Sequence, residues 1–179
     1  IWAPSTCSSE SVSHADVNRQ PGNSMPKRKK SAIQYRFKVK LKRRRSIWRS
    51  VVLRGDQTLD DLHEVIFSAF DRGDFHLYCF YFPNAAARRS QSGKQPKSYI
   101  SPEGFQPFEY DNRESADSAT LDELRFRVGQ TFEYLFDFGD EWWHEVTVES
   151  IDPSESGATY PRIVAQRGDS PPQYPEVDE

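Results

Sequence analysis

The sequence predicts an α+β fold, a roll in which a twisted, mainly antiparallel sheet is packed by one main and one short helix. Three observations support this prediction. Apolar and basic residues alternate in Gln34–Lys42, as in a half-buried strand. An apolar stripe with helical spacing follows Thr58. Aromatic residues alternate on both sides of Gly139-Asp140-Glu141, as in a hairpin. A chain of 179 residues can bury one core without cross-links, and Cys7 and Cys79 lack the spacing of a zinc or disulfide module.

The sequence places one folded domain in the middle of the chain. Its flanks are rich in Ser, Pro and charge, a composition that cannot bury enough apolar surface to fold. The expected divisions are a disordered basic N-terminal segment (1–32), the α+β domain (33–165), a long loop inserted within it (83–119) and a Pro-rich tail (166–179). Met25 precedes a basic PKRKK run, and we expect translation to begin there. No stretch approaches the roughly 18 apolar residues of a membrane span and no secretory signal is visible, so we expect a cytoplasmic protein without a membrane partner.

The first two strands are expected to pair as a hairpin. The turn between them is the basic run Arg43–Arg45, and the second strand is Ile47–Leu53. In the first strand, the apolar side chains should share one face and enter the core: Tyr35, Phe37, Val39 and Leu41.

The helix that follows has recognisable ends. Thr58 is a good N-cap because its hydroxyl can accept a hydrogen bond from the first turn, and the stripe Leu59–Phe70 ends near Gly73. The run His76–Phe82 is apolar on both faces and predicts a central strand. Thr120 is a second N-cap, which predicts a short helix over LDELRF.

Two registers compete for the hairpin in FDFGDEWWH. A two-residue turn would put Glu145 and Glu149 on the aromatic face, so we favour a three-residue loop, Gly139–Glu141. The expected pairs are Phe138 with Trp142, Phe136 with His144, Tyr134 with Val146 and Phe132 with Val148. The opposite face should then carry Asp137, Trp143, Glu145 and Glu149.

Charge is unevenly divided along the chain. The segment Met25–Arg54 holds 13 Lys or Arg and no Asp or Glu, whereas the rest is acidic. Basic clusters can bind nucleic acid through counterion release, and a site of that kind would use Lys27, Arg28, Lys29, Lys30, Arg43, Arg44 and Arg45. The preferred interpretation is internal complementarity, in which the strand lysines face acids across the sheet, because a pI of about 5.9 is low for a dedicated nucleic-acid binder.

Seven segments, in this order, resemble one known family: YRFKVKL, IWRSVVL, TLDDLHEVI, HLYCF, TLDEL, FEYLFDFGDEWWHEVTVESI and YPRIV. Over roughly Gln34–Val164 the chain is similar to the plasmid pRiA4b ORF-3-like family, whose members include proteins labelled as TnpR passengers of insertion sequences. DFGDEWWH is the most specific segment. The resemblance implies an α+β roll and an association with mobile elements, and it implies no established activity. Family members continue through a Cys-Pro-Pro-Glu-Asp-like segment, where this sequence reads Ser170-Pro171-Pro172-Gln173-Tyr174.

Five residues are candidates for a ligand or partner surface: Asp74, His76, Asp140, Trp142 and His144. We expect His144 to be a hydrogen-bonded core histidine rather than a ligand or base, and Asp140 to cap the hairpin turn. His63 is expected to be a partly exposed helix residue. The sequence has no HExxH-type spacing, phosphate cradle or recognisable nucleophile–base pair, so we expect no catalytic residue, metal or cofactor.

The leading interpretation is a non-enzymatic interaction or accessory module that binds an unidentified protein or small ligand through its aromatic sheet and the DFGDEWWH hairpin. Two alternatives remain open. A nucleic-acid accessory protein would use the basic N-terminal segment, and a metal-dependent hydrolase-like enzyme would bring Asp74, His76, Asp140 and His144 into one pocket.

Overall fold

The computed structural model describes residues 31–83, 97–105 and 113–174. These ranges form one sheet of eight strands in the order β5-β4-β3-β6-β7-β1-β2-β8, in which only the β4–β5 pair is parallel. The strands are β1 (Ile33–Leu41), β2 (Trp48–Arg54), β3 (Tyr78–Phe82), β4 (Lys97–Ile100), β5 (Arg113–Ser115), β6 (Thr131–Phe136), β7 (Trp142–Pro153) and β8 (Arg162–Arg167). The α-helices are α1 (Leu59–Ala69) and α2 (Leu121–Leu124), and the 3-10 helices are η1 (Pro102–Gly104) and η2 (Ala116–Ser118). The α+β prediction, with a mainly antiparallel sheet, one main helix and one short helix, is confirmed.

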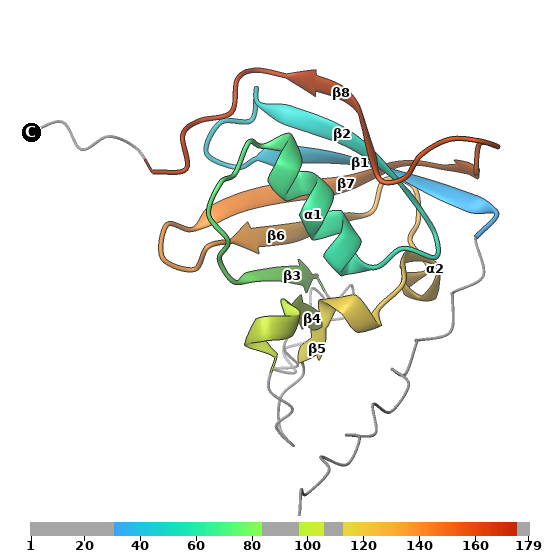
Figure 1. The fold of residues 1–179 in the computed structure, drawn as a ribbon, viewed down its shortest axis with the longest axis horizontal. Coiled ribbons are helices and arrows are strands. Elements are labelled where there is room, and N and C mark those ends of the chain that lie inside the picture. The colour runs from blue at the N-terminus through green and yellow to red at the C-terminus, as the bar shows by residue number, and fades with distance from the viewer. Residues whose placement is uncertain (1–30, 84–96, 106–112, 175–179) are drawn as a thin grey trace, which may run out of the picture.

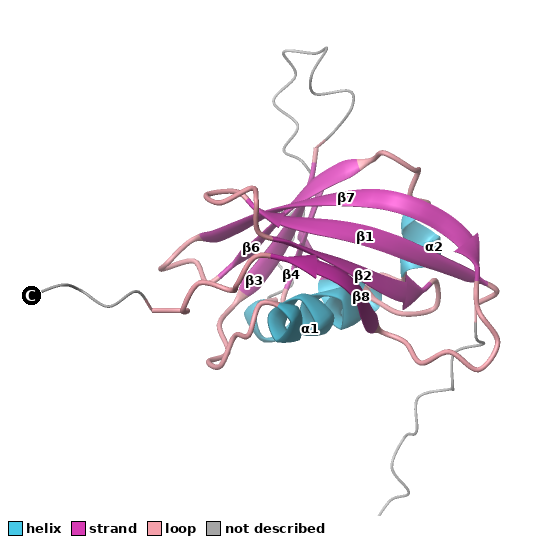
Figure 2. Cartoon of the chain, turned by 90° about the horizontal axis from the view of Figure 1, so that it is seen from above, coloured by secondary structure: helices cyan, strands magenta, loops and turns pink. Residues whose placement is uncertain are grey.

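The alternation of β1 determines which side of the sheet becomes the core. Phe37 and Val39 are fully buried and face α1, which lies across one face of the sheet (Figure 1, Figure 2). Around them, aromatic rings from β1, β3, β6 and the segment after α2 fill the space that one helix cannot cover. These rings include Tyr35, Phe80, Phe82, Phe126, Phe132 and Phe136.

The other face of β1 carries the lysines, and each meets a glutamate on a neighbouring strand. Lys38 lies 3.4 Å from Glu149 on β7, and Lys40 lies 3.7 Å from Glu145. Further along the same face, Lys42 lies 2.5 Å from Glu133 on β6. The prediction of internal charge complementarity is therefore confirmed for the strand lysines.

Neither described α-helix is long and apolar enough to cross a bilayer.

Both helix starts form as predicted. Thr58 and Asp61 make a reciprocal capping box at α1, and Thr120 makes the corresponding box at α2. The end of α1 differs in one detail from the predicted end near Gly73. Asp71, rather than Gly73, adopts the left-handed conformation, with φ of 53°, and the N–H of Arg72 then donates to the carbonyl of Phe67 at 3.1 Å.

The C-terminal end of α1 is held by a buried arginine from β2. Arg49 is 2% exposed, and its Nε donates to the carbonyl of Ala69 at 2.6 Å. Its Nη1 donates to the carbonyls of Trp48, Arg167 and Gly168, and its Nη2 donates to Ser170 Oγ. One guanidinium thus ties the helix to β8 and to the segment after it.

The register of the β6–β7 hairpin was predicted incorrectly, although its faces were right. Phe136 pairs with Trp142 and Tyr134 with His144, so the strands are shifted by two residues from the predicted pairing and the loop spans 137–141. A shift of two residues keeps every side chain on its expected face. The loop is organised by Asp137, whose Oδ1 accepts from the backbone N–H of Gly139 at 2.9 Å and whose carbonyl accepts from the N–H of Glu141 at 2.8 Å. Asp137 therefore takes the turn-capping role expected of Asp140.

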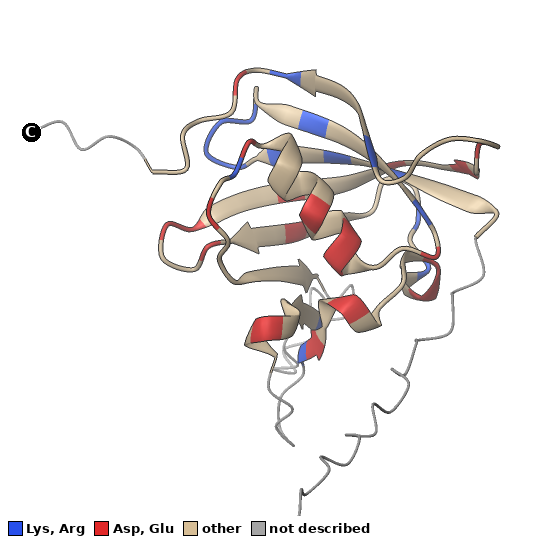
Figure 3. Ribbon diagram, viewed as in Figure 1, with Lys and Arg blue, Asp and Glu red and all other residues tan. Residues whose placement is uncertain are grey.

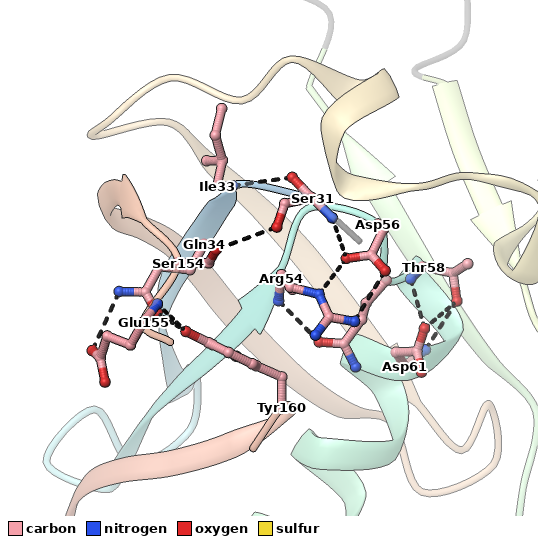
Figure 4. Close-up of polar contacts among 11 residues, drawn as sticks. Ser31, Ile33, Gln34, Arg54, Asp56, Thr58, Asp61, Ser154, Glu155 and Tyr160 are labelled. Carbon is pink, nitrogen blue, oxygen red and sulfur yellow. Dashed lines mark hydrogen bonds and ion pairs between the residues drawn. The ribbon is translucent and has the colours of Figure 1, made fainter. Parts of the chain in front are cut away.

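Both edges of the domain extend beyond the expected boundaries. Ser31, in the segment expected to be disordered, donates its backbone N–H to Asp56 Oδ1 at 3.1 Å, and Asp56 in turn is paired with Arg54 (Figure 4). At the other end, Gln173 Oε1 accepts from the backbone N–H of Gly73 at 3.0 Å. The described residues 166–174 therefore pack on the domain.

The segment expected as one long loop, 83–119, also differs from that expectation. Its described parts contain β4, η1, β5 and η2, and β4 pairs with β3. β4 has four residues and β5 has three, and strands this short carry little periodic signal.

Arg49→Met is expected to lower the free energy of unfolding by about 3 kcal/mol or more, because the buried carbonyls that it satisfies would lose their donor. Urea unfolding followed by tryptophan fluorescence measures this loss. Arg45→Met is the matched control, since Arg45 is 71% exposed and its replacement should change stability by less than about 0.5 kcal/mol. Equal effects of the two substitutions would contradict the role assigned to Arg49.

Candidate functional site

The structure separates the five predicted surface residues into two groups. Asp74, His76 and Asp140 lie near Tyr174 at the end of the described chain. His76 Nε2 is 2.8 Å from the Tyr174 hydroxyl and 3.5 Å from Asp137 Oδ2. The pKa of Tyr174 is raised by desolvation and by the nearby carboxylates, of which Asp74 has the strongest effect. His144 is not part of this group, so the structure does not form the four-residue pocket that the hydrolase alternative required.

Trp142 and His144 form the second group, below the C-terminal end of α1. His144 is 1% exposed, and its ring lies 4.9 Å from that of Phe70 and 5.2 Å from that of Tyr134, between centroids. Burial, reinforced by the charge of Arg72, lowers the pKa of His144 to about 3. The expectation of a core histidine is confirmed. The expected hydrogen bond is not found among the described residues.

An open pocket of about 500 Å³ lies beside α1, between that helix, β3 and η1. Its lining combines acids and rings. The acids are Asp60, Glu64 and Glu103. The rings are His63, Phe75, His76 and Tyr78.

The pocket follows from the spacing of polar residues on α1. Asp60, His63 and Glu64 stand at i, i+3 and i+4, so they share one flank of the helix next to its apolar stripe. Tyr78 reaches the same place from β3 and donates its hydroxyl proton to Asp60. Glu103 comes from η1, which follows β4. The pocket therefore needs both local helix spacing and the pairing of β3 with β4.

His63 forms the inner wall of the pocket. It is 4% exposed, so the expectation of a partly exposed residue is wrong. Its ring stacks on Tyr78 with centroids 3.7 Å apart, and its Nδ1 lies 2.7 Å from the hydroxyl of Tyr134. Burial lowers the pKa of His63 to about 3 and raises that of Tyr134, so both groups are neutral at pH 7. Among the described residues the Tyr134 proton has one acceptor, Nδ1 of His63, which assigns the single N–H proton of the neutral His63 ring to Nε2.

The three carboxylates concentrate negative charge that the described residues do not neutralise. Burial raises the pKa of Asp60, and the charge of Glu103 adds to this effect. Burial also raises the pKa of Glu64, followed by repulsion from Asp60 and the neighbouring acids. None of the three forms an ion pair with a Lys or Arg in the described part of the chain, and Figure 3 shows acidic residues on α1 and η1. The pocket is therefore suited to a cation.

Other kinds of site receive less support. Within 31–83, 97–105 and 113–174, no group of three His, Cys, Asp or Glu side chains is placed to hold a metal ion. Of the predicted nucleic-acid residues, Lys27 to Lys30 lie outside the described residues. Arg43 and Arg44 are exposed in the β1–β2 turn, and Arg45 lies 3.8 Å from Glu145.

Most of this pocket was not predicted from the sequence. Asp60 and Glu64 were detectable as polar neighbours of His63 at helical spacing, a pattern that is also typical of any solvated helix flank. Glu103 had no local signal, because η1 lies within the segment expected as loop. The predicted residue His76 does line the pocket.

Comparison with known proteins connects this fold to a family and to a solved structure. The family model described as plasmid pRiA4b ORF-3-like protein matches residues 33–174. The chain is also similar to the crystal structure of MM3350, a protein of unknown function from Methanosarcina mazei Go1. The identity is 27%, the TM-score is 0.63, and the match covers 80% of this chain and 74% of that one. No curated protein matches the chain.

Acid should destabilise the fold through its two buried histidines. His63 and His144 have pKa values of about 3 in the folded chain and about 6.5 when unfolded, so the unfolded state binds more protons below pH 6.5. Their contribution is complete above pH 6.5 and is lost as the pH falls toward 3, by about 1.4 kcal/mol per pH unit for each histidine.

Urea unfolding at pH 7, 6 and 5 measures this dependence. Replacing one of the two groups, as in His144→Gln, should reduce the histidine contribution to the slope by about half. A stability that stays constant from pH 7 to pH 5 would contradict the burial of both rings.

Proposed function

The chain belongs to the plasmid pRiA4b ORF-3-like family, and we propose that it is a non-enzymatic interaction module that binds a basic side chain of a partner protein in the pocket beside α1. The observation that supports this most directly is the gathering of Asp60, Glu64 and Glu103 around one open pocket without a basic partner among the described residues. An arginine or lysine side chain would supply the missing positive charge.

The rim of the pocket suits the apolar stem of such a side chain. Phe75 is 74% exposed and Leu77 is 41% exposed. Phe75 also stacks on Phe67 of α1, with parallel rings whose centroids are 4.8 Å apart, so it is held in place while its outer surface stays open. Arginine and lysine can lay their methylene groups on apolar surface and place the charged head among carboxylates.

The raised carboxyl pKa values favour a binding role for the charges. Asp60 and Glu64 are partly desolvated and repel each other, so their ionised forms are less stable in the free protein than in water. A bound guanidinium or ammonium group would favour the ionised forms. The same arrangement opposes folding slightly, which is common at sites kept for function rather than stability.

The chain's described cysteine does not suggest nucleophilic chemistry. Cys79 is 1% exposed, and burial raises the pKa of its thiol, which disfavours the reactive thiolate. An accessory role in mobile elements and a cytoplasmic location remain predictions.

Glu64→Gln should weaken binding of a basic peptide while raising the melting temperature, because it removes one charge of the pocket and one source of repulsion. Fluorescence anisotropy with a labelled hexa-arginine peptide measures the affinity, and we expect at least about a threefold loss, with a larger loss for the triple neutral variant Asp60→Asn, Glu64→Gln, Glu103→Gln.

Glu141→Gln is the matched control, since it removes one exposed negative charge from the β6–β7 loop. It should leave the affinity nearly unchanged. If Glu64→Gln and Glu141→Gln weaken the peptide equally, binding reflects net charge alone, and the pocket is not the site.

A further inference from the structure

Three side chains at the C-terminal end of α1 present buried nitrogens that have no hydrogen-bond partner among the described residues. They are Nε and Nη2 of Arg72, Nε1 of Trp142 and both ring nitrogens of His144. Arg72 is 7% exposed and His144 is 1% exposed. The backbone carbonyls of Trp142 and Tyr134 approach the His144 ring, without the geometry of a hydrogen bond. Buried polar groups are nearly always partnered, so a cluster of five unpartnered nitrogens requires an explanation.

These groups lie together, on elements that hold them firmly. Trp142 and His144 are two residues apart on β7 and face the same side of the sheet. The guanidinium carbon of Arg72 lies 3.8 Å from the centroid of the Trp142 ring. Arg72 Nη1 donates to the carbonyl of Pro171 at 3.2 Å, so the segment after β8 closes over the arginine.

The Arg72 guanidinium has no ion pair in the described part of the chain. Burial lowers the pKa of Arg72 and the charge of the neighbouring Asp71 partly opposes this effect, but the two side chains do not form an ion pair. The unpartnered edge, Nε with Nη2, is the edge of arginine that offers two parallel N–H groups to two oxygens. The indole of Trp142 adds a third N–H donor. Donors around an unpaired positive charge indicate an oxyanion.

His144 specifies the oxyanion further. Its burial keeps the ring neutral, so one nitrogen donates and the other accepts. A ligand that satisfies this ring must therefore carry an O–H group as well as bare oxygens. Hydrogen phosphate has both at neutral pH, whereas sulfate has only bare oxygens.

We propose that Arg72, Trp142 and His144 form a binding site for inorganic phosphate, which keeps an O–H group at neutral pH. Two oxygens accept from the Nε and Nη2 edge of Arg72, and the indole N–H of Trp142 donates to the same group. A protonated oxygen donates to the accepting nitrogen of His144. Trp142 is half-buried, so the site lies at the margin of the core. The site is separate from the acidic pocket and takes a ligand of opposite charge.

The direct test is a titration of the full chain with inorganic phosphate, followed by the ¹H–¹⁵N signal of the Trp142 indole and by the melting temperature. Phosphate should shift the indole signal saturably and raise the melting temperature, because it binds the folded state. Sulfate at equal ionic strength should bind at least about tenfold more weakly, because the site's accepting nitrogen would be left unpaired. Phenyl phosphate is mainly a dianion without an O–H group at pH 7, because its second pKa is about 6, so it should bind as weakly as sulfate. Phenyl phosphate that binds as tightly as inorganic phosphate would overturn the assignment of a protonated oxygen to His144.

Three variants separate the site from general effects of folding. Trp142→Phe keeps the ring and removes the indole N–H, and Arg72→Lys keeps the charge and removes the two-donor edge. Each should weaken the binding of phosphate by about tenfold or more. Trp143→Phe is the matched control. It should leave the affinity for phosphate unchanged, because Trp143 lies on the opposite face of β7 beside Lys42.

Several outcomes would overturn the proposal. Without a saturable phosphate effect in the native chain, there is no phosphate site. An equal loss of phosphate affinity in Trp142→Phe and Trp143→Phe would also exclude the site. These two variants still test the proposal if Arg72→Lys does not fold. Equal affinity for sulfate would overturn the assignment of a protonated oxygen to His144.

Discussion

A single helix of eleven residues must cover one face of an eight-stranded sheet, and most features of this molecule follow from that mismatch. The helix buries its apolar stripe on the central strands. Beyond its reach, the core is completed by aromatic rings packed against one another, including Phe126 against Phe132 with centroids 5.3 Å apart. Large rings are an efficient way to fill such space, because each buries a large area with few rotatable bonds.

The same mismatch leaves polar groups at both margins of the helix. At the C-terminal margin, Arg49 satisfies the carbonyls of Ala69 in α1 and of Gly168 after β8, while two nitrogens of Arg72 have no partner among the described residues. At the flank, Asp60 and Glu64 meet Glu103 across an open pocket. The two proposed sites therefore have opposite charge and lie around one helix. Tyr134 lies between them, since its hydroxyl contacts His63 and its ring contacts His144. Both histidines are buried and neutral, so the polar sites share one tightly packed aromatic centre.

The β6–β7 hairpin shows that residue alternation in the sequence predicts the buried face of a strand but not its register. Alternation of aromatic and charged residues determines which face of β6 and β7 is buried, and that prediction held. It cannot distinguish two registers that differ by two residues, because both keep the same faces. Asp137 fixes the observed register, because its carboxylate and its carbonyl accept the hydrogen bonds that organise the loop 137–141. The site was less predictable than the strands, since its acidic residues come from α1 and from η1, which are far apart in the sequence.

The sequence by itself determined the family, the α+β class, the face that each long strand buries and the starts of both helices. These depend on local periodicity and on capping residues such as Thr58 and Thr120, which act within a few positions of the chain. The tertiary structure alone decided the strand order, the pairing of β4 with β3, the burial of His63 and the meeting of Arg72 with Trp142. Those depend on contacts between residues brought together from distant segments, and neither spacing nor composition along the chain specifies which distant partner a side chain will meet.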